Sequence, residues 1–212
     1  MKAIAAEPYE HRGIIHSEMA LIIDTVRRLG VSVVIESGRA RGQSTYMLSK
    51  YLPCVSIHSV EMRRDTDVLF GIDRCADLPN VTLHQENGAE LVPQLVAANA
   101  PQRTAVLCDG PKGAAAVGII ERCFVHPNMV AGFIHDMRKL DHGGPSPHRA
   151  VAAERLPRHL FSDESRFVAE FSWMDANVVK GGQIVGPLHE AEFGSYGPTV
   201  GVFFNPHHDT ED

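Results

Sequence analysis

The chain has 212 residues, of which 44% are apolar and 22% charged, and its net charge is −6. This length suits a single domain over residues 1–212 with one core that needs no disulfide or metal to hold it together. A negative net charge gives the protein no overall positive potential that would attract nucleic acid. No apolar run approaches the roughly 18 residues that are needed to cross a bilayer. We therefore expect neither nucleic acid nor a membrane as a partner.

The N-terminus and the cysteines both indicate a reducing compartment. Residues 1–10 carry two carboxylates and lack the apolar core of a signal peptide, so we expect a cytoplasmic protein. The four cysteines show no CxxC pair or other metal-ligand spacing, and we interpret them as free, buried thiols.

Apolar periodicity predicts alternating helices and strands over the first two thirds of the chain. The apolar residues from Met19 to Leu29 recur at helical spacing, and Gly30 ends this helix. The β-branched run that follows is typical of a buried strand. We expect helices over 17–29, 43–52, 67–76, 89–98 and 114–124, alternating with strands over 31–35, 55–60, 81–84, 104–108 and 130–134.

Five strand–helix units in a row predict an α/β fold with a doubly wound, mostly parallel, Rossmann-like sheet. In such sheets, ligands bind beyond the carboxyl ends of the strands. Four acidic residues fall at predicted strand ends, namely Glu36, Glu61, Asp109 and Asp136. These positions predict where a binding site lies.

The last third of the chain has a different pattern. Segment 142–147 is rich in glycine and proline, which is typical of a loop or lid, and 149–160 is a predicted helix interrupted near Pro157. Residues 193–204 contain glycines ahead of an apolar strand. They predict a C-terminal antiparallel hairpin at the sheet edge.

A glycine-containing turn joins the first predicted strand to the helix after it. The segment Glu36-Ser37-Gly38-Arg39-Ala40-Arg41-Gly42-Gln43-Ser44 allows a ligand to approach the backbone closely, because glycine has no β-carbon. A dinucleotide site requires GxGxxG, and the spacing of Gly38 and Gly42 does not match it. The carboxylate of Glu36 opposes a pyrophosphate and favours a cationic ligand.

The pattern ExGxxxGxS after a first strand resembles motif I of class I S-adenosylmethionine-dependent methyltransferases. The likeness extends to Glu61, which matches the family's ribose-binding acid, and to Asn87, which stands where the family has an aspartate near the adenine. It covers residues 17–136 in order and spacing. The resemblance implies S-adenosylmethionine as cofactor, with Glu36, Gly38, Gly42, Gln43 and Ser44 at the methionine end, Glu61 at the ribose, Asn87 near the adenine and Asp109 beside the methyl group.

The segment after the fourth predicted strand bears on catalysis. Asp109 and Lys112 have the Asp-x-x-Lys spacing of the catechol O-methyltransferase group, and the Asp-Gly turn is also similar to macrocin-type O-methyltransferases. This resemblance implies Mg²⁺ held by Asp109 and Asp136, with Lys112 as a general base of lowered pKa that deprotonates a hydroxyl. Met137 departs from the catechol group, which has an amide or carboxylate there, because a thioether is a poor ligand for a hard cation. The candidates for completing the metal shell are His135, Asp141 and His142.

Each of these residues also has a purely structural interpretation. Asn87 and Asp109 suit turns and helix caps, Lys112 suits a solvated surface, and Asp136 suits an ion pair with Arg138 or Lys139. Their joint appearance at successive strand ends is what favours a binding site.

The sequence therefore predicts a methyltransferase that acts on a hydroxyl of a small molecule. An NAD(P)-dependent oxidoreductase is the alternative enzyme, because an acidic residue after the second strand suits any adenosine ribose, and a non-catalytic S-adenosylmethionine- or nucleotide-binding protein is the alternative from another class. We expect the acceptor pocket in the N-terminal helix region, 1–30, and the lid region, 139–192. The apolar C-terminal strand is a candidate interface for a homo-oligomer, and we expect Arg39 and Arg41 to be exposed.

Overall fold

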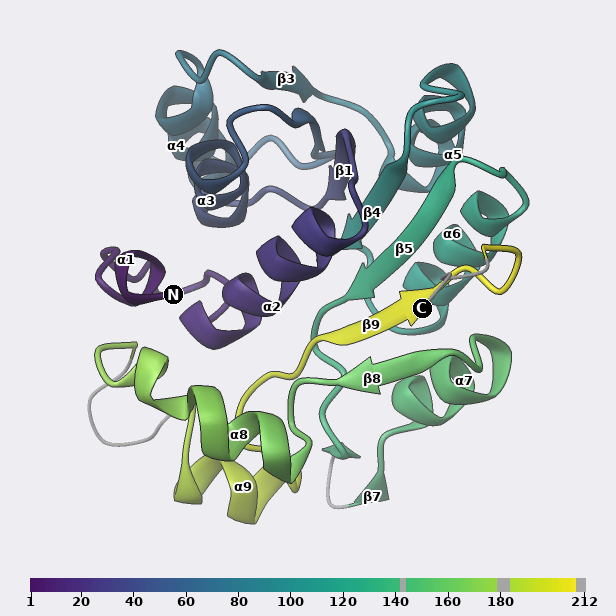
Figure 1. Ribbon diagram of the computed structural model, residues 1–212. Helices are drawn as coiled ribbons and strands as arrows, with labels where there is room; N and C mark the ends of the chain where they lie inside the picture. Colours follow the sequence, from purple (N-terminus) through teal and green to yellow (C-terminus); the bar gives the residue numbers. More distant parts are fainter. Residues whose placement is uncertain (142–143, 179–183, 209–212) are drawn as a thin grey trace.

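The computed structural model describes residues 1–141, 144–178 and 184–208. Strands and helices alternate as predicted over the first two thirds of the chain (Figure 1). The strands of this part are β1 (Val33–Ser37), β2 (Ser56–Val60), β3 (Val81–His84), β4 (Thr104–Cys108) and β5 (Met129–Ile134). The helices are α1 (Lys2–Ala5), α2 (His16–Arg28), α3 (Gln43–Tyr51), α4 (Thr66–Cys75), α5 (Gly88–Ala98) and α6 (Ala114–Phe124).

The main sheet has the strand order β3-β2-β1-β4-β5-β9-β8, and its first five strands are parallel. Strand β9 (Gly201–Phe204) lies antiparallel between β5 and β8 (His159–Phe161), so β8 forms an edge. Between β1 and β4 the order of the strands reverses, and such a switch point leaves a crevice at the carboxyl ends of the strands. The predicted doubly wound, mostly parallel α/β fold is confirmed.

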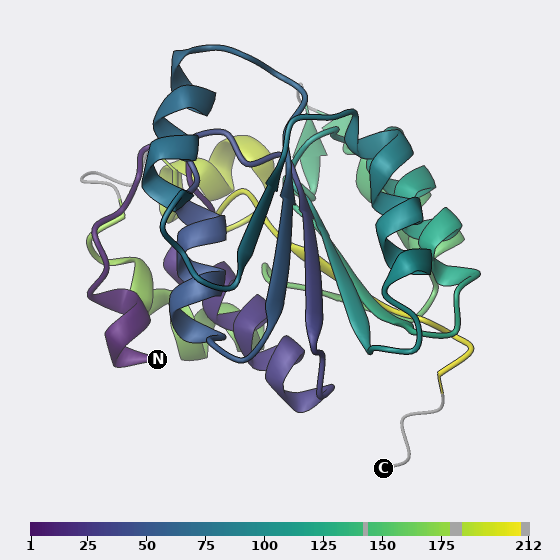
Figure 2. The same cartoon turned by 90° about the horizontal axis from the view of Figure 1, so that it is seen from above.

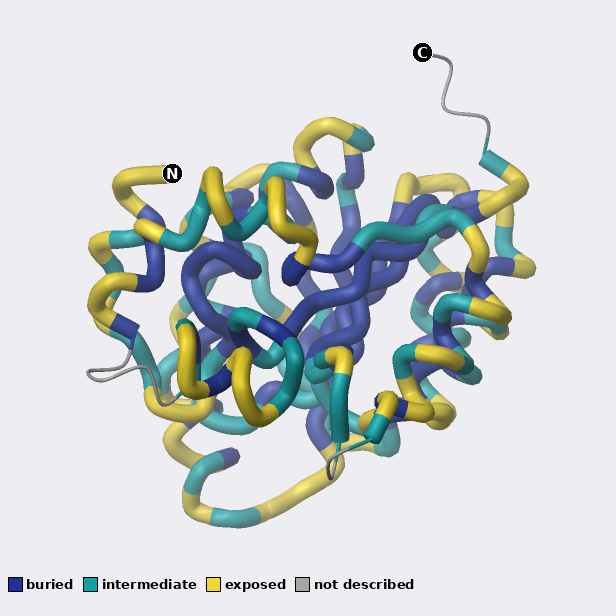
Figure 3. Tube along the Cα trace, turned by 90° about the horizontal axis from the view of Figure 1, so that it is seen from below, coloured by how far each residue is buried: buried dark blue, intermediate teal, exposed yellow. Residues whose placement is uncertain are grey.

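Helices cover both faces of the sheet, which is seen edge-on in Figure 2. One core packs α2 and α3 against the sheet through side chains such as Ile23 and Met47. The other core packs α5, α6 and α7 (Pro147–Arg155) against the opposite face, through Val92 and Ile120 among others. The central strands β1, β4 and β5 are therefore buried throughout (Figure 3), which explains their largely apolar sequences.

The C-terminal third differs from the expectation in two places. The predicted helix over 149–160 ends at Arg155, and His159–Phe161 form β8, because Pro157 has no N–H to continue the helical hydrogen bonding. The antiparallel C-terminal strands are present, but the partner of β9 is β8, which lies far back in the chain. The segment that leads into β9 contains α9 (Pro187–Phe193) instead of a strand.

Shorter elements complete the region between α6 and β9. They are β6 (Leu140–Asp141), β7 (Gly144–Pro145), α8 (Ser165–Phe171) and the 3₁₀-helix η1 (Ser172–Asp175). Strands β6 and β7 pair antiparallel as a separate two-stranded sheet.

The cysteines are free, and three of them are buried as expected, but Cys54 is exposed. Among the helices in the described part of the chain, none is long and apolar enough to cross a membrane.

Candidate functional site

A first cavity of about 400 Å³ lies at the carboxyl ends of β1, β2 and β4, at the switch point of the sheet. Its wall combines backbone of the glycine turn with residues that follow the strands, including Gly38, Glu61, Asn87 and Asp109. The volume falls within the roughly 300–1,000 Å³ that small-molecule sites enclose. The fold thus gathers these four predicted site residues around one cavity.

Part of the wall is formed by two glycines in close contact. Gly38 has a φ of +95°, which residues with a β-carbon rarely adopt, and a β-carbon there would lie 2.4 Å from Gly110 N. The Ser37 hydroxyl donates a hydrogen bond to the Gly110 carbonyl across the same contact. Backbone atoms therefore face the cavity, which permits the close approach of a ligand.

Glu61 follows β2 and is 7% exposed. Its two carboxylate oxygens accept hydrogen bonds from Ala40 N at 3.1 Å and from Arg63 N at 2.8 Å. These bonds fix the carboxylate at the cavity wall, and its remaining lone pairs can accept hydrogen bonds from ligand hydroxyls.

Asn87 is the N-cap of α5. Its Oδ1 accepts a hydrogen bond from Ala89 N at 3.0 Å, and its Nδ2 donates to Glu90 Oε1 at 3.1 Å. The capping role that the sequence left as an alternative is therefore present. Asn87 also lines the first cavity, and its contact with an adenine stays a prediction.

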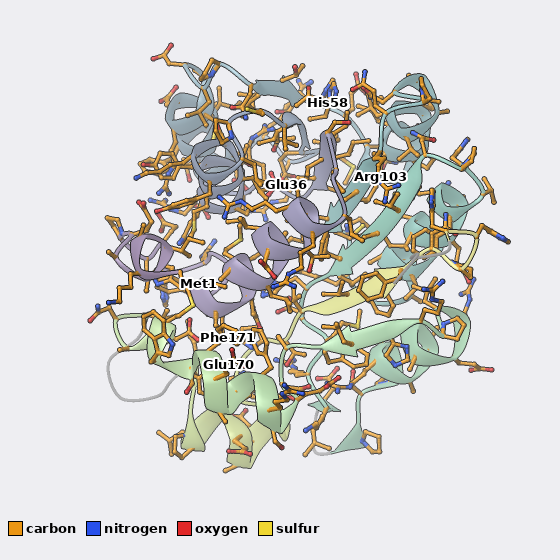
Figure 4. The ribbon with its side chains drawn as sticks, in the orientation of Figure 1. Met1, Glu36, His58, Arg103, Glu170 and Phe171 are labelled. Carbon is orange, nitrogen blue, oxygen red and sulfur yellow. The ribbon has the colours of Figure 1, made fainter. Side chains whose placement is uncertain are left out.

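Glu36 is fully buried on β1 (Figure 4), and hydroxyl groups surround its carboxylate. Ser44 and Thr45 of α3 donate hydrogen bonds to its two oxygens, and Ser59 donates another at 2.7 Å. Burial raises the pKa of Glu36 in spite of these donors. Glu36 and Ser44 thus bind each other and hold the turn against α3, and a direct cofactor contact from either stays a prediction.

Gly42 and Gln43 connect the turn to α3 and to the N-terminal segment. Gly42, with a φ of +75°, is the N-cap of α3. The Gln43 Oε1 accepts a hydrogen bond from Glu10 N at 2.7 Å. Both residues line a space of about 10 Å³ between the turn and the N-terminal segment, which is room for about one water molecule. Their predicted role as cofactor ligands stays a prediction.

An ion-pair network ties the N-terminal segment to the glycine turn and α4. Arg41 contacts Glu10 at 2.9 Å and Asp67 at 3.0 Å, and Arg12 contacts the same Asp67 at 2.5 Å. The expected exposure of Arg39 is wrong, because this residue is 2% exposed and donates to a β2 carbonyl at 2.8 Å. The turn folds back onto β2, which the sequence pattern did not indicate.

A second cavity, of about 190 Å³, adjoins the first at Asp109. It lies beyond the ends of β4 and β5, and its wall includes Tyr9, Arg12, Lys112, His135, Asp136 and Pro198. Tyr9 and Arg12 line it from the N-terminal region and Ile184 from the region 139–192, and its role as the acceptor pocket stays a prediction. Charged side chains dominate this second cavity.

A buried histidine connects two carboxylates at the second cavity. His135 Nδ1 lies 2.7 Å from Asp109 Oδ1, and His135 Nε2 lies 3.2 Å from Glu18 Oε2. Burial by itself would lower the pKa of His135, but Asp109 and Asp136 outweigh burial and, with Glu18, raise it to about 10. His135 is therefore a cation in the free protein at neutral pH.

Lys112 bridges the two predicted metal carboxylates. Its Nζ lies 2.8 Å from Asp136 Oδ2 and also contacts Asp109. Burial by itself would lower the pKa of Lys112, but the two carboxylates outweigh it and raise the pKa. Burial likewise would raise the pKa of Asp109, but His135 and Lys112 lower it to about 2. In the resting state, Lys112 is therefore an ammonium ion whose pKa is raised, whereas the sequence predicted a lysine of lowered pKa.

Asp109, His135 and Asp136 form a compact set of donors for a metal ion. One ligand atom from each lies within 4.8 Å of the other two. The backbone of Asp136 has a φ of +63°, a left-handed conformation that costs a residue with a β-carbon roughly 1–2 kcal/mol. Such strain is typical of functional positions.

Among the described residues, Asp141 is not part of this set, and neither is Met137, whose position the catechol group fills with a ligand. Met137 is fully buried in the core on the side of α5 and α6. Asp141 contacts Arg138 at 3.2 Å. His142 lies outside the described residues.

Sequence reasoning missed three residues of the two cavities. Glu18 falls within the helix predicted over 17–29, and nothing in that pattern indicated that its carboxylate reaches His135. Met62 lines the first cavity with 63% of its surface exposed, and its position directly after Glu61 was an available signal. Tyr9 lines the second cavity, and the sequence indicated only the N-terminal region that contains it.

No protein-family model matches the chain, and no curated protein matches it in sequence. Solved structures do match. An O-methyltransferase from Bacillus cereus in complex with SAH aligns with a TM-score of 0.58 and 13% identity, covering 96% of this chain and 87% of that one. The O-methyltransferase TomG from Streptomyces achromogenes, involved in tomaymycin synthesis and in complex with SAM, aligns with a TM-score of 0.54 and 15% identity, covering 91% and 82%.

A precorrin-6y C5,15-methyltransferase from Geobacter metallireducens aligns with a TM-score of 0.52 and 15% identity, covering 73% of this chain and 76% of that one. At such identities the likeness concerns the fold. The chain has the same Rossmann-like fold as these methyltransferases, so the predicted resemblance to class I methyltransferases, O-methyltransferases among them, is confirmed for the fold. Because O-methyltransferases and a C5,15-methyltransferase share this fold, it does not by itself decide the acceptor atom.

Proposed function

We propose that the chain is an S-adenosylmethionine-dependent methyltransferase that methylates a hydroxyl of a small molecule. The observation that carries the proposal is the first cavity, where Gly38 presents its backbone and Glu61 a fixed carboxylate. The two ribose hydroxyls of this cofactor need a hydrogen-bond acceptor, and its positively charged sulfonium needs surroundings that do not repel positive charge. The fold shared with methyltransferases supports the same assignment.

In this proposal the cofactor lies along the first cavity. Glu61 would accept hydrogen bonds from the ribose hydroxyls, Met62 and Asn87 would lie beside the adenine, and the backbone of Gly38 would contact the methionine end. Asp109, which lines both cavities, would lie beside the methyl group. Methyl transfer then takes place where the two cavities meet.

The acceptor hydroxyl enters the second cavity and must lose its proton, because a neutral hydroxyl is a weak nucleophile. Lys112 is the candidate base, although it is an ammonium ion while it bridges Asp109 and Asp136. A divalent cation held by these carboxylates would supply positive charge that lowers the pKa of the hydroxyl. Without its carboxylate partners, Lys112 would lose the cause of its raised pKa and could accept the proton at Nζ.

An NAD(P)-dependent oxidoreductase is the competing enzyme, because Glu61 suits any adenosine ribose. A pyrophosphate needs free N–H groups at the start of the helix after the glycine turn. Two of the N–H groups in this turn are engaged, since Ala40 N donates to Glu61 and Gly42 N donates to Arg39 O. This hydrogen bonding favours a methyltransferase over a dinucleotide enzyme.

The first experiment is calorimetric titration of the purified protein with S-adenosylmethionine and, separately, with NADH. We expect S-adenosylmethionine to bind with a micromolar Kd and NADH not to bind. Binding of NADH alone, or of neither compound, would contradict the proposed function.

A second experiment separates the enzyme from a non-catalytic binding protein. Transfer of a labelled methyl group to a panel of hydroxylated small molecules is measured with and without added divalent cations. Label on a hydroxyl oxygen supports the enzyme. Binding of S-adenosylmethionine with no transfer to any member of the panel, under either condition, supports the non-catalytic alternative.

A further inference from the structure

The side chains at the ends of β4 and β5 combine oxygen and nitrogen donors. His135 is 6% exposed, and its Nδ1 lies 2.7 Å from Asp109 Oδ1 and 3.6 Å from Asp136 Oδ1. The imidazole therefore faces both carboxylates from within the cluster. Mg²⁺ prefers an octahedron of oxygen ligands, so this mixed set of donors does not match its preference.

Imidazole suits divalent transition ions, while carboxylates suit Mn²⁺ as well as Mg²⁺. We propose that the cluster binds a divalent transition ion of the Mn²⁺ class in preference to Mg²⁺, through His135 Nδ1, Asp109 and Asp136. The inference deepens the proposed function at the second cavity and rests on it only for the role of the ion in turnover. Ion binding itself is measurable without a methyl acceptor.

Glu18 is the residue that fixes the imidazole. Its Oε2 lies 3.2 Å from His135 Nε2, and its Oε1 accepts a hydrogen bond from Ser162 Oγ at 3.1 Å. Ser162 Oγ in turn accepts a hydrogen bond from Val200 N at 2.9 Å. His135 Nε2 and Glu18 Oε2 are in contact without hydrogen-bond geometry, and the carboxylate charge favours a proton on Nε2. A metal ion would therefore replace the proton that Nδ1 shares with Asp109. Glu18 is therefore a positioning residue for the ligand.

Lys112 competes with the ion for the same carboxylates. Its Nζ lies 2.8 Å from Asp136 and also contacts Asp109, so it neutralises the charges that a bound ion would neutralise. Ion binding displaces this ammonium group, and His135 releases its Nδ1 proton to the solvent. Removing the charge of Lys112 should therefore strengthen ion binding.

The test is calorimetric titration of the protein with MnCl₂ and, separately, with MgCl₂. We expect wild-type protein to bind Mn²⁺ about 100-fold more tightly than Mg²⁺. His135→Asn replaces nitrogen by an oxygen donor and should lower this ratio of affinities about tenfold, and Glu18→Gln should weaken Mn²⁺ binding about tenfold.

Lys112→Met should bind Mn²⁺ several-fold more tightly than wild type. His207→Asn, an exposed histidine after β9 at the opposite end of the sheet, is the matched control and should leave both affinities unchanged.

Electron spin-echo spectroscopy of the Mn²⁺ complex adds a signature that a purely structural role would not produce. A coordinated imidazole gives nitrogen modulation of the Mn²⁺ signal. We expect this modulation in wild type and in His207→Asn, and we expect it to be lost in His135→Asn. Thermal unfolding of each variant checks that it is folded.

Several results would overturn the inference. They are equal affinities for Mn²⁺ and Mg²⁺ in wild type, nitrogen modulation that survives in His135→Asn, and no binding of Mn²⁺ to the folded protein. Each of these is distinguishable from failure of the proposed function, because the latter is measured by S-adenosylmethionine binding and methyl transfer.

Discussion

The two cavities are built in different ways. The first is formed by the ends of successive strands and the turns after them, and the backbones of Gly38 and Gly110 pack closely there. The second is formed by charged side chains from segments far apart in the sequence, such as Glu18 and His135. A site made of backbone turns leaves a local sequence pattern, whereas a site made of long-range side-chain contacts does not. Predictions for each cavity test this difference.

We expect the largest effect from Gly38→Ala in the first cavity. The new β-carbon would lie 2.4 Å from Gly110 N on a backbone with a φ of +95°, so the turn must shift. We expect S-adenosylmethionine affinity to fall about 100-fold or more, together with a lower thermal unfolding temperature. Calorimetry and thermal unfolding measure these effects.

The matched control is Gly118→Ala in the middle of α6, where a β-carbon would meet nothing within 4 Å. This change should stabilise the protein by about 0.4–1 kcal/mol and leave cofactor affinity unchanged. If Gly38→Ala behaves like this control, the backbone of the turn does not form the cofactor site.

The next largest effect concerns the charge cluster of the second cavity. Lys112→Met removes the candidate base and leaves Asp109 and Asp136 without their shared ammonium group. Turnover on an active acceptor should fall about 100-fold, within the range of general-base catalysis, while S-adenosylmethionine affinity changes little. Lys139→Met, a half-exposed lysine after β5, is the control. Undiminished turnover by Lys112→Met would remove the general-base role.

A buried carboxylate close to the second cavity provides a pH-dependent test. Asp175 Oδ1 accepts a hydrogen bond from Ser17 N at 3.0 Å, and burial raises the pKa of Asp175 to about 6. Its folded pKa thus lies above the unfolded value of about 3.9, so its stabilising contribution is full below pH ~4 and is lost as the pH rises through 6. Asp175→Asn keeps an acceptor for Ser17 and should be about 2 kcal/mol more stable than wild type at pH 8.

Urea denaturation at pH 4, 6 and 8 measures the gain from Asp175→Asn, which should vanish at the lowest pH. Asp77→Asn, at an exposed position, is the control and should change the free energy of unfolding by less than about 0.5 kcal/mol at each pH. A gain that does not depend on pH would mean that packing, and not the buried charge, is responsible.

The smallest effect is expected for Glu61→Gln in the first cavity. The amide keeps one oxygen for a ribose hydroxyl but loses the second acceptor and the charge, so S-adenosylmethionine should bind about tenfold more weakly. Glu86→Gln, at an exposed position beyond β3, is the control for calorimetry. Unchanged affinity in Glu61→Gln and in Glu61→Ala would show that the ribose assignment is wrong.

The sequence by itself determined the elements from β1 to β5 and the edge of the sheet at which a site lies. Burial makes the central strands β1, β4 and β5 short, largely apolar runs, and each covering helix carries its own apolar periodicity. Parallel strands then bring their carboxyl ends together whatever side chains they carry. For this reason Glu61, Asn87 and Asp109 were identified, and they line the same cavity.

Only the tertiary structure decided which side chains meet. It directed Glu36 towards hydroxyl groups of α3, buried Arg39 under the turn and paired β8 with β9. It also brought Glu18 of α2 to His135 at the end of β5 and placed Lys112 between two carboxylates. A local sequence pattern indicates which side of its own helix or strand a residue lies on, and whether that side is buried. Contacts between distant segments depend instead on how helices and strands pack across the sheet, which no local periodicity specifies.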